Sequence, residues 1–168
     1  MSHIEHKYGM SDTLRVMVIT ISDTRDVCTD KSGQLMIKLL HREHFEISEY
    51  IIVKDEKIDI ESALLQGCRN QEIDVILTNG GTGLSGRDVT FEVLENLFEK
   101  QIPGYGELFR MLSYEEIGSA AMLSRATAGI VDGTVIFSTP GSTGAVKLAM
   151  EKLILPELRH IVREIRKD

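Results

Sequence analysis

The sequence predicts an α/β fold, a three-layer αβα sandwich with a mainly parallel central sheet and a C-terminal β-hairpin element. Apolar runs rich in β-branched residues alternate with helical periodicity through the first half of the 168-residue chain, which indicates right-handed βαβ units. The dipeptide Asp132-Gly133 separates two further apolar runs and is typical of a type I′ hairpin turn. With 42% hydrophobic residues, the chain can bury one core without disulfides.

The first half of the chain contains three expected strands and three expected helices. Residues 15–21, 45–53 and 73–78 are apolar runs of strand length. Between them, apolar residues recur with helical spacing over about 32–43 and 58–68. Asp30 or Ser32 is suited to cap the first of these helices. A third helix is expected from Asp88 to about Lys100, because Phe91, Leu94 and Leu97 recur on one face.

The second half changes pattern after residue 100. Residues 101–106 contain Pro and Gly and are expected to form a turn. Residues 107–122 are expected to be helical in two pieces split near Gly118, followed by hairpin strands over 127–131 and 134–138. A helix to about Leu155 should then end, because Pro156 interrupts the pattern. A last helix is expected after Pro156, with apolar residues at spacings of three and four.

Composition excludes several classes of protein. The net charge of −7 with no basic cluster disfavours a nucleic-acid binder. No apolar run is long enough to span a membrane, the N-terminus lacks a signal sequence, and the two cysteines have no metal-type spacing. We therefore expect a soluble, cytoplasmic protein with a flexible tail over residues 1–12 and a single domain over 13–168.

The most informative stretch is residues 73–90, where an apolar strand passes through glycines into a helix. Gly80, Gly81 and Gly83 leave space for an anion to approach the backbone, and free amides at a helix N-terminus favour phosphate. Asp88 would repel a polyphosphate unless a cation lies between them. The stretch therefore predicts a phosphate ligand bound together with a divalent metal ion, Mg²⁺, which prefers carboxylate and phosphate oxygens.

Polar or small residues follow four of the expected strands. These segments are Ser22-Asp23, Asp55-Glu56, Gly80-Gly81-Thr82-Gly83 and Pro140-Gly141-Ser142. Ligands bind at the carboxyl ends of strands in open parallel sheets, so we expect the first three segments to converge, and the fourth as well if its strand is parallel. Taken singly, each segment has a simpler interpretation as a turn or a helix cap. The simpler interpretation of Asp88 is that its negative charge interacts favourably with the dipole of the helix that follows.

Two known phosphate motifs match the glycine stretch only in part. Residues 81–86 fit G-x-G-x-x-G, but no second strand with a terminal acidic residue follows, as a dinucleotide site requires. Arg87-Asp88 stands where a P-loop has Lys-Ser/Thr. Neither motif is therefore assigned, and a nucleotide-binding oxidoreductase is the weakest of the functional hypotheses.

Taken together, these segments resemble the MoaB/MogA family of molybdenum cofactor biosynthesis proteins, which includes molybdopterin adenylyltransferases. The likeness covers residue 14 to the C-terminus, with Asn79 and Phe91 departing from the family pattern. The segments that carry it are Ser22-Asp23-Thr24-Arg25, Asp30-Lys31-Ser32-Gly33, Val53-Lys54-Asp55-Glu56, residues 79–83 and 87–90, Gly104-Tyr105-Gly106-Glu107, Arg110-Met111, Ser124-Arg125-Ala126 and residues 140–143. Residues 109–113 indicate the MoaB branch.

The resemblance implies a function and a set of site residues. It implies Mg²⁺-dependent transfer of AMP from ATP to the molybdopterin phosphate, with release of pyrophosphate, by a homotrimer or a hexamer of two trimers. Asp55 and Asp88 would be the catalytic, metal-binding residues. Substrate and nucleotide would contact Ser22, Asp23, Gly80, Gly81, Thr82, Gly83, Glu107, Pro140, Gly141 and Ser142. The alternative is a non-catalytic carrier or scaffold that binds molybdopterin in the same pathway.

Overall fold

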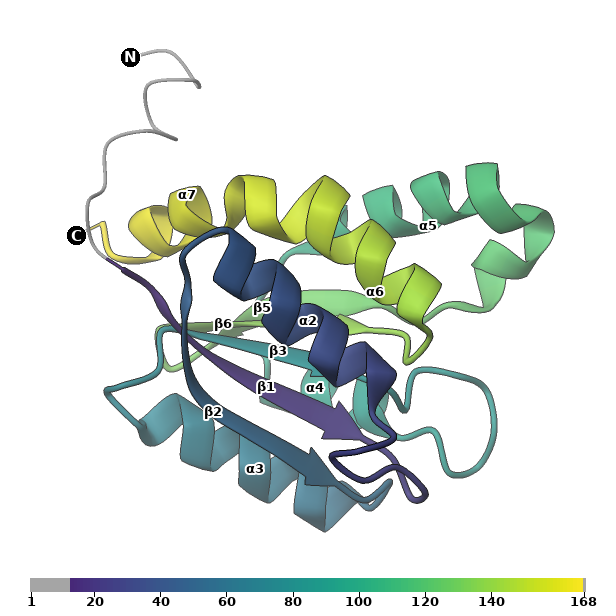
Figure 1. The fold of residues 1–168 in the computed structure, drawn as a ribbon, viewed down its shortest axis with the longest axis horizontal. Coiled ribbons are helices and arrows are strands. Elements are labelled where there is room, and N and C mark those ends of the chain that lie inside the picture. The colour runs from purple at the N-terminus through teal and green to yellow at the C-terminus, as the bar shows by residue number, and fades with distance from the viewer. Residues whose placement is uncertain (1–12, 168) are drawn as a thin grey trace.

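The computed structural model describes residues 13–167, and its six strands form one mixed sheet (Figure 1). The strands are β1 (Arg15–Ile21), β2 (Glu46–Val53), β3 (Val75–Asn79), β4 (Lys100–Gln101), β5 (Thr127–Val131) and β6 (Thr134–Thr139). Their order is β2-β1-β3-β6-β5-β4. The pairs among β2, β1, β3 and β6 are parallel, and β5 and β4 are antiparallel to their neighbours. The predicted tail, residues 1–12, lies outside the described residues.

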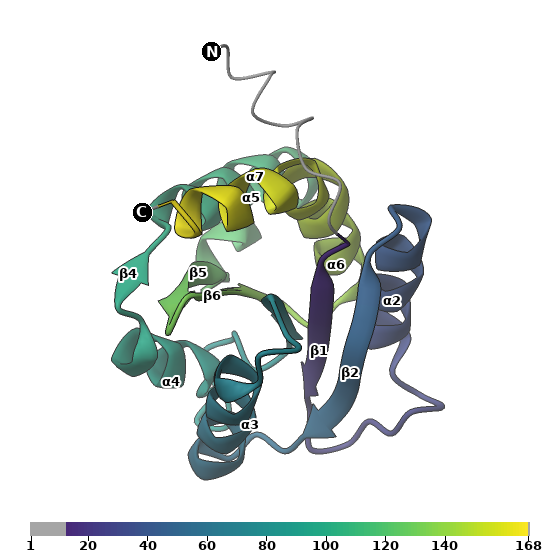
Figure 2. The ribbon, with the colours of Figure 1, turned by 90° about the vertical axis from the view of Figure 1, so that its left-hand side faces the viewer.

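Helices cover both faces of the sheet (Figure 2), which confirms the predicted three-layer sandwich. One face is covered by α2 (Lys31–Arg42), α5 (Pro103–Ile117), α6 (Thr143–Ala149) and α7 (Leu155–Ile165). The other is covered by α3 (Lys57–Arg69) and α4 (Thr90–Leu97). Every residue of β3 is buried, and its side chains alternate between the two cores, as Leu77 and Ile76 illustrate. No helix among residues 13–167 is long and apolar enough to cross a bilayer.

The predicted hairpin is confirmed and carries β6 into the parallel part of the sheet. Val131 and Thr134 are paired, which leaves a two-residue turn. Asp132 and Gly133 have φ values of 50° and 76°, the positive pair that a type I′ turn requires. The turn reverses the chain so that β6 lies parallel to β3. The fourth polar segment therefore does reach the same sheet edge as the first three.

Residues 98–106 differ from the sequence-based prediction. The third helix ends at Leu97 rather than near Lys100, and β4 follows it and pairs with β5. The expected turn over 101–106 is mostly the start of α5, which begins at Pro103. Proline suits a first helical turn, where its missing N–H has no partner to lose. The pairing that makes β4 is a long-range contact, which local periodicity cannot reveal.

The break expected at Pro156 is also absent. A π-helical segment, η2 (Met150–Ile154), joins α6 to α7 without interruption. The N–H of Leu155 bonds to the carbonyl of Met150, five residues earlier. Proline cannot donate a backbone hydrogen bond, and its ring crowds the preceding α-helical turn. The wider π turn directly before Pro156 lets the helix continue.

Gly129 provides a test of how β4 is attached. A Cβ atom at Gly129 would lie 2.5 Å from the Phe98 ring and 2.7 Å from the Lys100 carbonyl oxygen. Gly129→Ala should therefore lower the free energy of unfolding by about 1–3 kcal/mol, measured by urea denaturation. Gly144→Ala is the control, because nothing lies within 4 Å of its added Cβ. Equal stability of the two variants would show that β4 is not held as described.

Candidate functional site

The four predicted segments meet at the carboxyl edge of the sheet, on the right in Figure 1. The Ser22 N–H donates to the Val53 carbonyl at 2.8 Å, and the Gly80 N–H donates to the Thr139 carbonyl at 3.0 Å. A Cβ added at Gly141 would lie 3.2 Å from the Gly80 Cα. Loops that are more than 100 residues apart along the chain therefore form one surface.

We call residues 80–89 the glycine loop, and it begins with a turn that only glycine accommodates. Gly80 and Gly81 have φ values of 102° and 68°, in the left-handed region that disfavours side chains. A Cβ at Gly80 would overlap the Ile21 carbonyl oxygen, and one at Gly81 would overlap the Thr90 hydroxyl. The Thr90 N–H in turn donates to the Gly81 carbonyl at 3.1 Å.

Three consecutive amides, beginning at Gly81 in this turn, have no hydrogen-bond partner among residues 13–167. Among the hydrogen bonds of residues 13–167, none is donated by the backbone N–H of Gly81, Thr82 or Gly83. Thr82 is only 5% exposed, and backbone donors in partly buried positions need an acceptor. Successive free amides in a glycine turn form a concave anion-binding group.

Asp55 and Asp88 approach this turn from two sides. A Cβ at Gly81 would lie 3.2 Å from Asp55 Oδ1, and a Cβ at Gly83 would lie 2.7 Å from Asp88 Oδ2. Asp88 Oδ2 accepts hydrogen bonds from the Ser85 N–H at 3.1 Å and the Ser85 hydroxyl at 2.7 Å. The backbone N–H of Asp23 approaches the Asp55 carboxylate and favours its charged form, whereas α3 begins at Lys57 without a side-chain cap, so Asp55 does not cap a helix.

The charge around Asp55 is strongly negative. Burial raises the pKa of Asp55, and the neighbouring carboxylates of Asp23 and Asp88 raise this pKa further. Asp23 Oδ1 accepts the Asp55 N–H at 3.1 Å. Arg87 supplies a counter-charge through ion pairs of 3.0 Å with Asp23 and 2.8 Å with Glu56. Both pairs are substantially exposed, so solvent screens them.

The fourth segment is anchored from the opposite side of the edge. The Gly141 carbonyl accepts hydrogen bonds from Arg25 Nη2 at 2.9 Å and from the Ser32 hydroxyl at 2.6 Å. Ser142 is the N-cap of α6, with its hydroxyl accepting the Ala145 N–H at 3.1 Å. The Ser142 hydroxyl therefore already has a structural partner.

A fully buried carboxylate supports these loops from below. Asp30 caps α2 by accepting the Gly33 N–H at 3.0 Å, and it accepts the Thr20 hydroxyl at 2.6 Å and the Tyr50 hydroxyl. Asn79 Nδ2 donates to the Thr20 hydroxyl at 2.9 Å. Burial and then Asp30 raise the pKa of Tyr50, so this phenol stays protonated as a donor.

The structure thus brings most of the predicted site residues to one edge. Those placed there are Ser22, Asp23, Asp55, Gly80, Gly81, Thr82, Gly83, Asp88, Pro140, Gly141 and Ser142. Glu107 lies exposed on α5, and no hydrogen bond or ion pair within residues 13–167 joins it to the loops.

Two arginines contact the loops and were not among the predicted site residues. Arg25 binds the Gly141 carbonyl, and Arg125 binds the carbonyls of Gly83 and Asp88. No local pattern marks either arginine as a loop contact. Both nevertheless stand in segments that carry the family resemblance.

The donor set suits a metal ion that is only partly held by protein. Within residues 13–167, no three His, Cys, Asp or Glu side chains are grouped as metal ligands. Mg²⁺ typically takes one or two carboxylates and completes its shell with water and substrate phosphates. Asp55 and Asp88 beside the free amides fit that arrangement.

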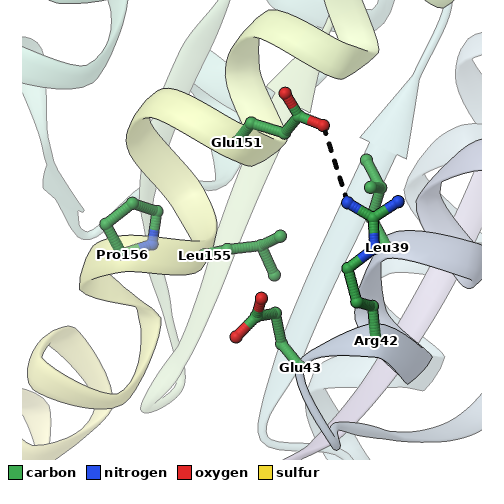
Figure 3. Close-up of a pocket in the computed structure, with 6 residues that line it drawn as sticks. All are labelled: Leu39, Arg42, Glu43, Glu151, Leu155 and Pro156. Carbon is green, nitrogen blue, oxygen red and sulfur yellow. Dashed lines mark ion pairs between the residues drawn. The ribbon is translucent and has the colours of Figure 1, made fainter.

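A separate hollow lies far from this chemistry (Figure 3). It is lined by Leu39, Arg42, Glu43, Glu151, Leu155 and Pro156. Because α2 ends there just before β2 begins, the hollow is at the amino edge of the sheet. Its polar side chains are Arg42 and Glu151, which form an ion pair at 3.9 Å, and Glu43, so Arg42 is the one cationic side chain that lines it. We therefore place the functional site at the carboxyl edge.

The chain matches known proteins over nearly its whole length. The family model described as "Probable molybdopterin binding domain" matches residues 17–160. "Molybdenum cofactor biosynthesis protein B" of Bacillus subtilis (strain 168) is 59% identical over 100% of this chain and 99% of the relative. The protein of the same description from Staphylococcus aureus (strain Mu50 / ATCC 700699) is 52% identical over 94% of this chain and 95% of the relative.

Solved structures of similar proteins support the same family assignment. A crystal structure of a "Molybdenum cofactor biosynthesis protein B" superposes with a TM-score of 0.91 at 54% identity, covering 94% of this chain and 98% of that one. The "tungsten cofactor synthesizing protein MoaB from Pyrococcus furiosus" gives 0.85 at 42% identity, covering 94% and 100%. The chain therefore belongs to the molybdopterin-binding domain family, in the MoaB/MogA group that the sequence motifs indicated.

Proposed function

We propose that this protein acts in molybdenum cofactor biosynthesis by transferring AMP from ATP to the terminal phosphate of molybdopterin, with release of pyrophosphate. The observation that carries the proposal is the row of free amides at Gly81, Thr82 and Gly83, with the Asp55 and Asp88 carboxylates beside it. Amides bind phosphate oxygens directly, whereas carboxylates repel them unless a cation is shared. The description of the family supports molybdopterin as the bound molecule, and the name of the Bacillus subtilis relative supports a role in molybdenum cofactor biosynthesis.

The reaction needs positioning more than it needs a protein nucleophile. An oxygen of the molybdopterin phosphate forms a bond to the α-phosphorus of ATP, and the bond from that phosphorus to the β-phosphate oxygen breaks. Such transfers depend on alignment and on neutralisation of charge. The free amides of the glycine loop would hold phosphate oxygens, and Asp55 and Asp88 would hold the cation. Mg²⁺, when bound, would neutralise charge on the phosphates.

The rigidity of the loop supports this assignment. The Gly80–Gly81 turn is fixed by Thr90, and Asp88 is oriented by Ser85. Groups held in place before the substrate binds need no reorganisation during the reaction. The second anchored loop, at Gly141, would limit where the other end of the substrate lies.

A non-catalytic carrier of molybdopterin is the alternative, because binding alone would use the same amides. Asp55 favours the enzyme. Burial and the carboxylates of Asp23 and Asp88 raise its pKa, an arrangement that a cation would stabilise but a simple anion carrier would not need.

Asp88→Asn tests the role of the carboxylate. Asparagine keeps an oxygen that can accept from Ser85 but removes the charge, so the fold should persist. Pyrophosphate release from ATP in the presence of molybdopterin should fall at least about a hundredfold. Glu115→Gln, which changes an exposed acid on α5, should leave the rate unchanged. Wild-type turnover by the Asp88 variant would refute the role, and wild-type protein that binds molybdopterin without releasing pyrophosphate would identify a carrier.

Asp55→Asn should make the free protein more stable. Because the folded-state pKa of Asp55 is raised above its unfolded value, ionisation of Asp55 costs stability as the pH rises through that raised pKa. At pH 7 the variant should therefore melt at a higher temperature than the wild type, and the gap should close below about pH 4. Differential scanning calorimetry across pH 3–8 measures both. A variant that is less stable at pH 7 would contradict the crowding of carboxylates.

The resemblance also implies self-association, for which we propose the outer face of α5 and η1 (Gly118–Leu123). Exposed apolar side chains gather there: Leu108, Met111, Tyr114, Ile117, Met122 and Leu123. Contiguous exposed apolar patches on globular proteins mark interaction sites, and the proposed partners are further copies of this chain in a trimer or a hexamer.

Light scattering tests this surface. The wild type should have the mass of three or six chains, and the double variant Met111→Lys/Ile117→Lys should be monomeric, because burying two charges without partners costs several kcal/mol. Ile58→Lys is the control, since Ile58 is 81% exposed and lies on α3, on the other face of the sheet. A monomeric wild type, or a double variant that still assembles, would exclude the surface.

A further inference from the structure

Arg125 connects both ends of the glycine loop to the helix that follows it. Its Nε donates to the Gly83 carbonyl at 3.1 Å, and its Nη2 donates to the Asp88 carbonyl at 3.0 Å. Within residues 13–167, the only other hydrogen bonds from residues 84–87 to distant parts of the chain are the exposed Arg87 pairs. One guanidinium group thus links the Gly83 and Asp88 carbonyls, in addition to the hydrogen bonds between Ser85 and Asp88 within the loop.

The guanidinium itself is held firmly. Its Nη1 is paired with the Glu92 carboxylate, and its plane lies over the Phe91 ring, 5.2 Å from the ring centroid. The Arg125 side chain is 23% exposed. The hydrogen bond from Arg125 lowers the pKa of Glu92, so Glu92 stays ionised at neutral pH. Both partners belong to the first turn of α4.

These contacts fix the direction of the peptide groups in the loop. The carbonyl of one residue and the N–H of the next point in opposite directions across a planar peptide. Holding the Gly83 and Asp88 carbonyls therefore orients the amides of Leu84 and Val89 away from Arg125. The same contacts keep Asp88 beside Gly83, where its carboxylate approaches the free amides.

A simple surface ion pair would not account for this arrangement. Exposed ion pairs contribute little to stability, and Glu92 alone would satisfy the charge. Two of the four contacts instead go to carbonyls of the glycine loop, 42 and 37 residues away in sequence. Lysine cannot reproduce them, because a single ammonium lacks the planar fork and the stacking surface of arginine.

We propose that Arg125 is a positioning residue that clamps the glycine loop in the conformation that binds phosphate. The inference rests on the proposed function only for the identity of the ligand. Arg125 acts on the ligand by holding the backbone at Gly83, whose own N–H is one of the free amides, and by placing Asp88, without touching the reacting atoms.

The chain offers a matched control for this role. Arg159 also donates to a backbone carbonyl, that of Glu43 at 2.9 Å, and also lies over a phenylalanine ring, Phe45 at 4.2 Å. Glu43 follows the end of α2, at the amino edge of the sheet. Arg159→Lys therefore removes the same kinds of contact as Arg125→Lys, but away from the glycine loop.

The test compares Arg125→Lys, Arg125→Met and Arg159→Lys in two measurements. NMR hydrogen exchange measures the exchange rates of the Ser85, Asp88 and Thr90 amides, which donate hydrogen bonds to acceptors in the glycine loop. Calorimetry reports the affinity for inorganic pyrophosphate with Mg²⁺. Both Arg125 variants should exchange these three amides at least about tenfold faster and bind pyrophosphate at least about tenfold more weakly, a ratio that corresponds to 1.4 kcal/mol. Arg159→Lys should stay within twofold on both.

Several results would overturn the inference. Wild-type exchange rates and pyrophosphate affinity in Arg125→Met would exclude the clamp. Wild-type values in Arg125→Lys would show that only the positive charge at position 125 is needed. Equal effects in Arg125→Lys and Arg159→Lys would indicate general destabilisation. If the wild type bound pyrophosphate but transferred no AMP, the proposed reaction would fail, whereas faster amide exchange and weaker pyrophosphate binding in the Arg125 variants would still support the clamp.

Discussion

The turn at Gly80 and Gly81 is the constraint on which the rest of the site depends. The buried strand β3 ends directly before it, and the chain must leave the sheet between the Ile21 carbonyl and Thr90. Only glycine fits both the space and the positive φ values. The consequence is a row of amides that no group of the described chain satisfies. The described chain thus presents these amides in the conformation that the proposed phosphate site requires.

The site is electrostatically unfavourable without a ligand. Asp55 lies near Asp23 and Asp88, and its pKa is raised by burial and by these neighbours. Functional sites commonly retain such conflicts, which a bound cation can relieve. The carboxylates favour a positively charged ligand, whereas the amides favour a negatively charged one. A phosphate bridged by a cation supplies both charges.

Much of the fold could be predicted from the sequence because its signals are local. The strand periodicity of residues 15–21 and 73–78, and the Asp132-Gly133 turn, each specify an element without reference to the rest of the chain. Parallel pairing then determines that Asp23, Asp55 and Gly81 share an edge. What was missed depends on distant contacts. β4 exists only because β5 pairs with it, and Arg125 reaches the glycine loop from beyond η1. Likewise, the π segment before Pro156 lets the helix continue past a proline through a change in hydrogen bonding, which side-chain periodicity does not reveal.

The most direct test of the account is a crystal structure with Mg²⁺ and an ATP analogue that cannot be cleaved between the α- and β-phosphates. The account predicts phosphate oxygens within hydrogen-bonding distance of the Gly81, Thr82 and Gly83 amides, with the metal bound by Asp55 and Asp88. Phosphates bound elsewhere, for example beside Arg42 at the amino edge, or a metal bound away from both aspartates, would contradict it.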